Sequence, residues 1–146
     1  MLKAFELIAT VCATLFAGAA LYINLVEHPS RMGLETEMAA LHWAPSYKRA
    51  TWLHAPLALL SFGSGVVAWS LGAGLGWLVA ALLIGAVVPV TYLIIMPTNQ
   101  KLLTSGRDLS SPETRALLMR WGELHAIRTC LSLLSSGLYL WLTHGV

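Results

Sequence analysis

The chain has 146 residues, of which 57% are hydrophobic and only 11% are charged. Soluble domains carry roughly 45–50% apolar and about 25% charged residues, so this composition excludes a disordered chain and an ordinary globular protein of the cytosol. Nine basic and seven acidic residues leave a net charge of +2, which is too small to indicate a nucleic acid as partner. The composition therefore predicts a single integral membrane domain over residues 1–146.

Four stretches are apolar enough to be membrane helices, each of which needs about 20 mostly apolar residues. The predicted spans lie at about 5–27, 48–71, 75–97 and 112–143. In the last one the strongly apolar part is short and covers only 127–142. Its helix is nevertheless predicted to begin near Ser111, because a capping hydroxyl, a proline and an acidic residue follow one another there. We therefore expect an all-α, integral membrane four-helix bundle with an extended amphipathic start to its last helix.

The basic residues predict the orientation of these spans. Four spans put both termini on one side, and the connection at 71–76 carries no charge. The other two connections hold seven of the nine basic residues, which are Arg31, Lys48, Arg49, Lys101, Arg107, Arg115 and Arg120. The positive-inside rule predicts that these two connections are cytoplasmic and that both termini lie outside.

Polar side chains recur at helical spacing near the basic ends of all four spans. The sets are Asn24, His28 and Arg31; Tyr47, Thr51 and His54; Tyr92 and Asn99; and Trp121, His125, Arg128 and Ser132. Within each set the spacing of three, four or seven residues places the side chains on one helix face. Such residues are costly at membrane depth and normally face the bundle interior. The four sets together predict one polar pocket near the cytoplasmic interface.

Simpler explanations exist for some of these residues. Arg31, Lys48, Arg49 and Arg120 lie near span ends, where long cationic side chains reach lipid headgroups. The tryptophans and Tyr47 also fit an interfacial aromatic belt. No such explanation suits the polar residues that lie inside or at the edge of apolar runs, and these are His54, Asn99, His125 and Arg128. We expect them to form a functional site.

Two motifs carry a resemblance to a known family. The segment Pro97-Thr98-Asn99-Gln100-Lys101-Leu102 is similar to a Pro-Thr-Asn-x-x-Leu signature, and Trp121-x-x-x-His125-x-x-Arg128 is the second motif. With the helix that ends in His28-Pro29-Ser30-Arg31, they make residues 18–137 resemble the anthrone oxygenase-like family of small four-helix membrane proteins. The bacterial members were formerly grouped as a domain of unknown function. The resemblance implies a protein of the bacterial inner membrane.

The resemblance also implies a reaction, because characterised fungal members oxidise a tricyclic anthrone to an anthraquinone with molecular oxygen. The fungal last-helix motif tends to carry Asn where His125 stands here, which leaves the substrate open. We expect an enzyme of the oxygenase or oxidoreductase type that acts on a small apolar, aromatic or polycyclic substrate drawn from the lipid bilayer. Under this interpretation O₂ is the co-substrate and no cofactor is required.

Such a reaction needs a base that removes a proton next to the substrate carbonyl, and histidine is the natural choice. We expect His125 to be this base, with Asn99 and Arg128 stabilising the enolate oxygen. His28 and His54 are supporting or alternative bases. The residues expected to bind the substrate are Trp52, Trp121, Tyr92, Asn24, Tyr47 and Thr51, the first three as aromatic walls.

Two alternatives use the same residues differently. His28, His54 and His125 come from three helices at a similar depth, so they are candidate ligands for Cu, Fe or Zn. Two of them are candidate axial ligands for haem between helices. A third interpretation is a non-enzymatic accessory subunit of a membrane complex. The sequence leaves the oligomeric state open, and the packing of the helices distinguishes these interpretations.

Overall fold

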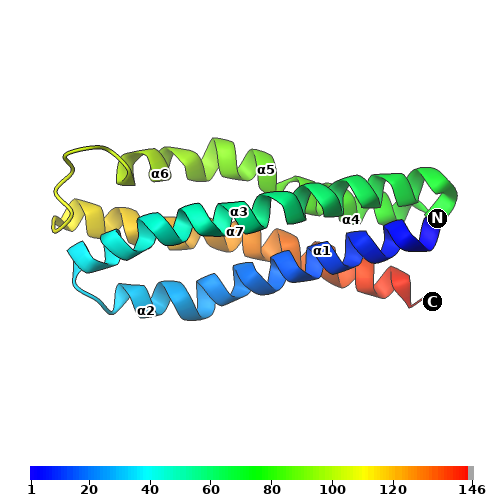
Figure 1. Ribbon diagram of the computed structural model, residues 1–146, viewed down its shortest axis with the longest axis horizontal. Helices are drawn as coiled ribbons and strands as arrows, with labels where there is room; N and C mark the ends of the chain where they lie inside the picture. The colour runs from blue at the N-terminus through cyan, green and yellow to red at the C-terminus, as the bar shows by residue number, and fades with distance from the viewer. Residues whose placement is uncertain (145–146) are drawn as a thin grey trace.

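The computed structural model describes residues 1–144, and throughout this part the chain is all helical apart from short connections (Figure 1). The helices join end to end into four rods. The first and the third contain π-helical turns, whereas the second ends in a turn at Gly72, whose φ is +94°. The first rod comprises α1 (Leu2–Tyr22), η1 (Ile23–Glu27) and α2 (His28–Met32), and the second comprises α3 (Thr36–Ala68) and η2 (Trp69–Ala73). The third comprises α4 (Leu75–Gly85), α5 (Val87–Val90), η3 (Thr91–Ile95) and α6 (Met96–Leu102), and the fourth is α7 (Pro112–Thr143).

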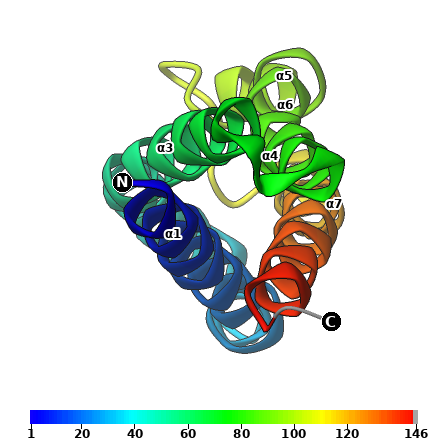
Figure 2. The same ribbon diagram turned by 90° about the vertical axis from the view of Figure 1, so that its right-hand side faces the viewer.

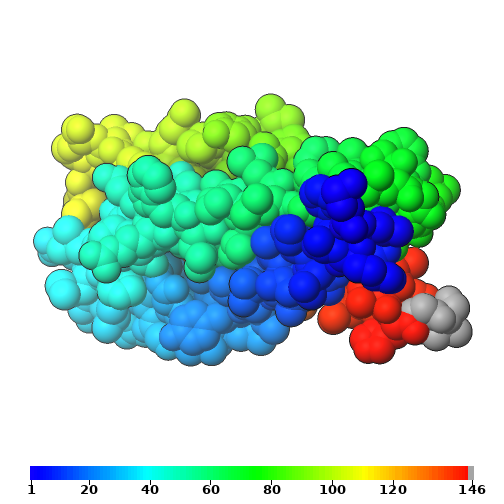
Figure 3. All heavy atoms as spheres, turned by 45° about the vertical axis from the view of Figure 1, so that its right-hand side comes forward, coloured from blue at the N-terminus to red at the C-terminus, as the bar shows by residue number. Residues whose placement is uncertain are grey.

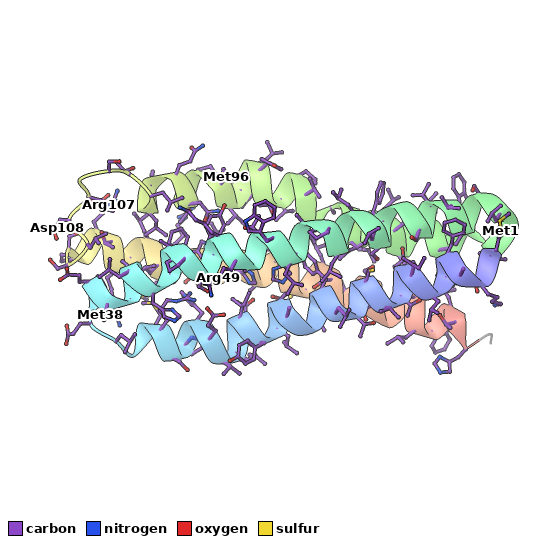
Figure 4. The ribbon with its side chains drawn as sticks, viewed as in Figure 1. Met1, Met38, Arg49, Met96, Arg107 and Asp108 are labelled. Atoms are coloured by element: carbon purple, nitrogen blue, oxygen red, sulfur yellow. The ribbon has the colours of Figure 1, made fainter. Side chains whose placement is uncertain are left out.

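The rods occupy the corners of a square when the molecule is seen end-on (Figure 2). The first rod packs against α3 and α7, and α4 packs against the same two helices from the opposite corner. The N-terminus and the end of α7 lie at the same end of the bundle (Figure 1). Arg107 and Asp108 mark the connection at the other end, far from Met1 (Figure 4).

Three of the four rods are long and apolar enough to cross a membrane, and they cover Leu2–Met32, Thr36–Ala73 and Leu75–Leu102. The chain is therefore a membrane protein by length and composition of its helices. The fourth rod, α7, is 32 residues long but more polar, because its first half carries Glu113, Arg115, Arg120 and Glu123.

The observed helices extend beyond the predicted spans at the basic end of the bundle. The second rod begins at Thr36, whereas the sequence predicted a start near residue 48. The predicted span followed the start of the apolar run, whereas the helix begins before that run. The added turns bury Ala39, Ala40 and Trp43 against Leu118 of α7, so tertiary packing continues the helix even past Pro45.

The start of α7 agrees with its sequence signals. Its bounds match the predicted 112–143 helix, and the Ser111 hydroxyl accepts a hydrogen bond from the Thr114 backbone N at 3.2 Å. The preceding turn is held by Asp108, whose Oδ1 accepts bonds from the side chain and backbone N of Ser110. These bonds lower the pKa of the Asp108 carboxyl.

The third rod is not straight, and this shapes the site. Its helix breaks at Ala86 between α4 and α5, and Pro89 follows, which lacks an N–H and disturbs the preceding turn. In Figure 1 the rod steps sideways at this point, so that α5 and α6 run along a line displaced from α4. Pockets lie along α3 on this side of the bundle.

Candidate functional site

Asn24 joins the first rod to α7 at the predicted depth. It lies in the π-helical turn η1, and such turns often occur at functional sites. Its Nδ2 donates to the Gly122 carbonyl at 3.0 Å, while its Oδ1 accepts from His125 Nδ1 at 2.8 Å and from Thr129. Because an amide oxygen only accepts, His125 carries its hydrogen on Nδ1 and keeps a lone pair on Nε2. Asn24 therefore orients the His125 ring.

The Arg31 side chain is buried, and each of its three nitrogens has a polar partner. It forms an ion pair with Glu27, donates to Ser46 Oγ at 3.1 Å, and its Nε donates to His42 Nδ1 at 3.2 Å. His28 Nδ1 lies 3.2 Å from its Nη1. The lipid-headgroup explanation is thus wrong for Arg31, because the side chain turns inward to a carboxylate. It connects the first rod to α3.

Trp121 lies in the core between the histidines. Its ring centroid is 5.2 Å from that of His28, 5.0 Å from that of His125 and 5.8 Å from that of Trp43. His28 packs against Gly122, where a Cβ atom would meet the imidazole at 2.5 Å. This part of the predicted site is therefore a packed layer of rings.

A pocket of about 290 Å³ opens between α3 and the third rod, with Phe16 of α1 and Arg128 of α7 behind it. We call it the lateral pocket, and it is lined by Phe16, Tyr47, Thr51, His54, Ala55, Ala58, Leu59, Val87, Val88, Thr91, Tyr92, Met96 and Arg128. Leu59 and Tyr92 are 61% and 66% exposed. The pocket thus opens sideways, onto the surface that would face lipid.

An apolar groove adjoins the lateral pocket at the break in the third rod. It shares Ala58, Leu59 and Val88 with the pocket and continues to Phe62 and Pro89. Its volume is about 520 Å³. The groove and the lateral pocket therefore share an apolar wall beside the break in the third rod.

His54 lines the lateral pocket and carries a buried lone pair. Its side chain is 2% exposed, and its ring packs edge-on against Phe16 with centroids 4.6 Å apart. Nδ1 lies 2.9 Å from the Ala50 carbonyl, so Nδ1 is the donor and the hydrogen resides there. Nε2 is buried and has no hydrogen-bond partner among residues 1–144. His54 is therefore held in the tautomer that accepts a proton at Nε2.

Arg128 provides a positive charge in the same pocket. Within the described residues it makes no ion pair and no hydrogen bond, and its Nε is buried. Its guanidinium lies 5.4 Å from the centroid of the Phe16 ring. A cation among apolar walls without a carboxylate is costly, and an anionic oxygen on a ligand would compensate it.

The structure divides the predicted site residues into two groups. The lateral pocket brings together Tyr47, Thr51, His54, Tyr92 and Arg128 from three rods. The residues outside its lining are Asn24, His28, Asn99, Trp121 and His125, which lie in the packed interior at the same end. The two groups meet where the His54 and His125 ring centroids are 6.4 Å apart.

Trp52 belongs to neither group, because its side chain is 84% exposed. One helical residue turns the side chain by about 100°, so Trp52 points away from the face that carries Thr51. Trp52 does not line the lateral pocket, and its predicted role as a wall of the substrate site stays a prediction. Asn99 is fully buried, and neither atom of its amide has a partner in the described part of the chain. Its predicted role at the enolate oxygen stays a prediction.

A second pocket of about 690 Å³ lies on the opposite side of α3, between α3 and the first rod. Its lining is Ala19, Tyr22, Ile23, Glu27, His42, Pro45, Ser46, Arg49, Ala50, Leu53 and His54. Sequence reasoning gave no role to His42 or Ser46. The i, i+4 spacings of Glu27 with Arg31 and of His42 with Ser46 were the available signals.

The alternatives can be compared with this geometry. Within residues 1–144, no three His, Cys, Asp or Glu side chains come close enough to hold a metal ion. The geometry therefore does not favour a metal on His28, His54 and His125. The haem and accessory-subunit interpretations stay predictions, although the buried histidines face the interior and not the lipid.

Comparison with known proteins agrees with the resemblance that the two motifs at 97–102 and 121–128 indicate. The family model described as anthrone oxygenase matches residues 43–138, a stretch that contains every residue of the lateral pocket except Phe16. The anthrone oxygenase tpcL of Aspergillus fumigatus is 38% identical over 72 residues, which cover 47% of this chain and 45% of that protein. The matched region thus spans less than half of this curated relative. No solved structure matches the chain. Because the family model covers more than half of its length, the chain belongs to the anthrone oxygenase family.

Proposed function

We propose that the chain is a membrane-embedded oxygenase that oxidises a flat, apolar aromatic substrate of the anthrone type in the lateral pocket. Family membership indicates an oxygenase-type function. The observation that carries the site is the pairing of His54 Nε2, a lone pair without a partner, with the guanidinium of Arg128 in one apolar pocket. A base beside a cation suits a substrate that becomes an enolate.

The proposal includes four spans, with α7 as the fourth. The N-terminus and the end of α7 lie at the same end of the bundle (Figure 1), as an even number of spans requires. Most basic residues lie at the other end, which the positive-inside rule assigns to the cytoplasmic side of a bacterial inner membrane. The lateral pocket then opens to lipid, where an apolar substrate concentrates.

The proposed reaction begins with proton transfer. His54 Nε2 takes a proton from the substrate CH₂ group, and the electron pair moves onto the carbonyl oxygen, where Arg128 stabilises the enolate. The enolate carbon then transfers electrons to O₂. A C–O bond forms, and the proton on His54 Nε2 returns to the peroxide oxygen. The second C–H bond and the O–O bond then break, so that the CH₂ becomes C=O, one oxygen atom stays in the product and the other leaves as water with both hydrogens. The aromatic rings of Phe16 and Tyr47 flank the flat substrate.

This assignment prefers His54 to His125 as the base. His125 lies outside the pocket lining, and its Nδ1 is held by Asn24. Its ring faces that of His54, which suits a supporting role behind the base. Asn99 likewise lies outside the lining, so the proposal places Arg128 alone at the enolate oxygen.

Oxygen uptake and quinone absorbance of the purified protein in lipid nanodiscs, with an anthrone as substrate, test this proposal. We expect turnover well above the uncatalysed rate, and His54→Gln to lower kcat by about 10²–10⁴-fold, the usual contribution of a general base. His125→Gln should lower it less. His144→Gln, at an exposed position, is the matched control and should have no effect. Full turnover by the His54→Gln variant would exclude His54 as the base.

A further inference from the structure

Two threonine hydroxyls line the lateral pocket, and each donates its hydrogen to its own helix. Thr51 Oγ1 donates to the Tyr47 carbonyl at 3.0 Å, and Thr91 Oγ1 donates to the Val87 carbonyl at 2.7 Å. Because a hydroxyl has one hydrogen and two lone pairs, each oxygen can still accept a hydrogen bond but has no hydrogen left to donate. The pocket therefore presents two neutral hydrogen-bond acceptors.

Hydroxyls elsewhere in the bundle connect one rod to another. Thr14 Oγ1 of the first rod lies 2.9 Å from Ser136 Oγ of α7, and Thr129 of α7 donates to the first rod. Thr51 and Thr91 differ from these, since within residues 1–144 each forms a hydrogen bond only with its own helix. Their remaining acceptor capacity is thus left for a molecule in the pocket.

The two hydroxyls lie on opposite walls of the pocket, near the depth of the proposed base. Ala58 of α3 and Val87 of the third rod pack in one buried cluster, and the two helices run in opposite directions (Figure 1). About one turn nearer the basic end, His54 on α3 and Thr91 on the third rod therefore lie at the same depth. Thr51 lies nearly one further turn toward that end. Figure 3 shows the face on which α3, drawn cyan to green, lies beside the yellow-green third rod.

The other polar groups of the lining show what kind of ligand fits. Arg128 is a donor only and suits an oxygen that becomes anionic, whereas the phenols of Tyr47 and Tyr92 can donate or accept. The two threonines need donors on the ligand. A ligand that satisfies the whole lining therefore carries O–H groups in addition to its carbonyl oxygen.

We propose that Thr51 and Thr91 determine specificity, because they accept hydrogen bonds from hydroxyl groups on the outer rings of a flat aromatic substrate. This inference rests on the proposed function of the lateral pocket and deepens it, since it states which substituents the substrate carries and which residues recognise them.

A hydroxyl gains most from such an acceptor in a pocket that opens to lipid. No water is present there to bond a substrate hydroxyl, and an unbonded polar group in an apolar medium is costly. A hydroxyl directly beside the substrate carbonyl bonds that carbonyl within the molecule. A hydroxyl further round an outer ring has no such partner, so the threonines should favour hydroxyls away from the carbonyl.

The first measurement uses stable quinones and needs no turnover. One anthraquinone carries a hydroxyl on each outer ring, away from the carbonyls, and its counterpart carries methyl groups at the same positions. At a pH that keeps the hydroxyls protonated, we expect the protein in lipid nanodiscs to bind the first compound more tightly, by roughly 2–10-fold for each hydrogen bond. Equal affinity for the two, after correction for partition into empty nanodiscs, would overturn the proposal.

Valine substitutions identify the residues responsible. Thr51→Val and Thr91→Val keep the side-chain shape and remove the acceptor, so together they should abolish the preference for hydroxyls. Affinity for the methyl compound should stay the same, which also shows that the pocket is folded. Thr91→Ser keeps the hydroxyl and should keep the preference. Thr104→Val is the matched control, because Thr104 also donates to the carbonyl four residues before it, at 3.0 Å, but lies outside the pocket.

A preference that survives the double substitution would exclude the two threonines as its source. Should the double variant fail to fold, Thr91→Val alone should reduce the preference by roughly 2–10-fold, since it removes one bond. An unchanged preference in that variant would exclude Thr91.

The second measurement compares oxidation of an anthrone with and without outer-ring hydroxyls. The double valine variant should lower kcat/KM for the hydroxylated anthrone, mainly by raising KM, and leave that of the plain anthrone unchanged. Equal losses for both would show that the threonines shape the pocket and do not recognise hydroxyls. If no variant oxidises either anthrone, yet the quinone preference depends on the two threonines, hydroxyl recognition is supported and the proposed reaction alone fails.

Discussion

The two ends of the bundle are packed in different ways. In the apolar half, which contains Ala9, Ala13, Ala68, Ala80 and Ala81 with Trp77 and Tyr139, small residues let the helices approach closely. The buried hydroxyls there donate to backbone carbonyls, as Ser61 does to Ala9 and Ser135 to Ala80. In the polar half, which contains Asn24, His54, His125 and Arg128, the rods contact one another through larger polar and aromatic side chains, and two pockets flank α3.

The difference is sharpest in the buried polar atoms that lack a partner. Within residues 1–144 such side-chain atoms belong to Trp43, His54, Asn99, Trp121 and Arg128, and all of these residues lie in the polar half. Glu6 Oε2, at the other end, forms an ion pair with Lys3 at 2.8 Å. Buried polar atoms in proteins are normally satisfied, and an exception calls for an explanation. One half of this bundle is thus built for packing, whereas the other holds buried polar atoms without partners among residues 1–144, which supports the proposal that this half binds a ligand.

The largest effect expected from this contrast is that of Arg128→Met. Loss of the cation at the developing enolate should lower kcat by about 10²–10³-fold, as removal of one oxyanion-stabilising donor does. The free energy of unfolding should not fall, because the replaced charge has no ion-pair partner among the described residues. Steady-state oxygen uptake and unfolding in mixed micelles measure the two quantities.

Arg120→Met is the matched control for this prediction, since Arg120 lies on the same helix but is exposed. It should change neither quantity. A variant that lost activity and stability together at Arg128 would show instead that the guanidinium holds the helices in place.

Sequence reasoning identified the residues of the polar half more accurately than it predicted their arrangement in space. The spacing of Tyr47, Thr51 and His54 placed them on one helix face, and the structure puts all three in the lateral pocket. Periodicity identifies which residues share a face, but not how one helix is rotated against the next. For that reason it ranked His125 ahead of His54, although only His54 lines the pocket.

The periodicity of the sequence could not predict the pockets themselves. The lateral pocket lies beside the break at Ala86 in the third rod, and a proline alone predicts neither the size nor the direction of such a step. The apolar half, in contrast, follows from composition, because runs of alanine, glycine and serine in apolar helices favour close contacts.

Gly65→Ala tests the apolar half and should have the next largest effect. A Cβ atom at Gly65 would lie 1.9 Å from the Tyr139 hydroxyl and 2.9 Å from Ala81 Cβ. Relief of this overlap requires Tyr139 to move, at a cost of about 1–3 kcal/mol in the free energy of unfolding. Gly63→Ala is the control two residues away, where a Cβ meets nothing within 4 Å. Activity per folded molecule should be unchanged in both variants, and a loss of activity at Gly65 would contradict the separation of the two halves.

Asn24→Ala should have a smaller effect, and on the polar half only. It removes the bonds to Gly122, His125 and Thr129, which together should cost about 1–2 kcal/mol at the modest strength of hydrogen bonds between membrane helices. Turnover should fall severalfold, since His125 loses the group that orients it. Asn24→Asp keeps the acceptor and should recover part of the turnover. Equal turnover in both variants would show that orientation of His125 does not matter.

Trp52→Ala should have the smallest effect, and it compares the aromatic wall predicted from the sequence with the one proposed for the lateral pocket. Trp52 is 84% exposed and lies outside the lateral pocket, so KM for an anthrone should stay the same and stability should change by no more than about 0.5 kcal/mol. Tyr47→Ala is the comparison, because Tyr47 lines the pocket and stacks on Trp43 with centroids 5.1 Å apart. Its loss removes one side of the substrate site and should raise KM. If Trp52→Ala raised KM as much as Tyr47→Ala, the substrate would bind on the outer face of α3, and the contrast between a packed half and a ligand-binding half would have to be redrawn around that surface.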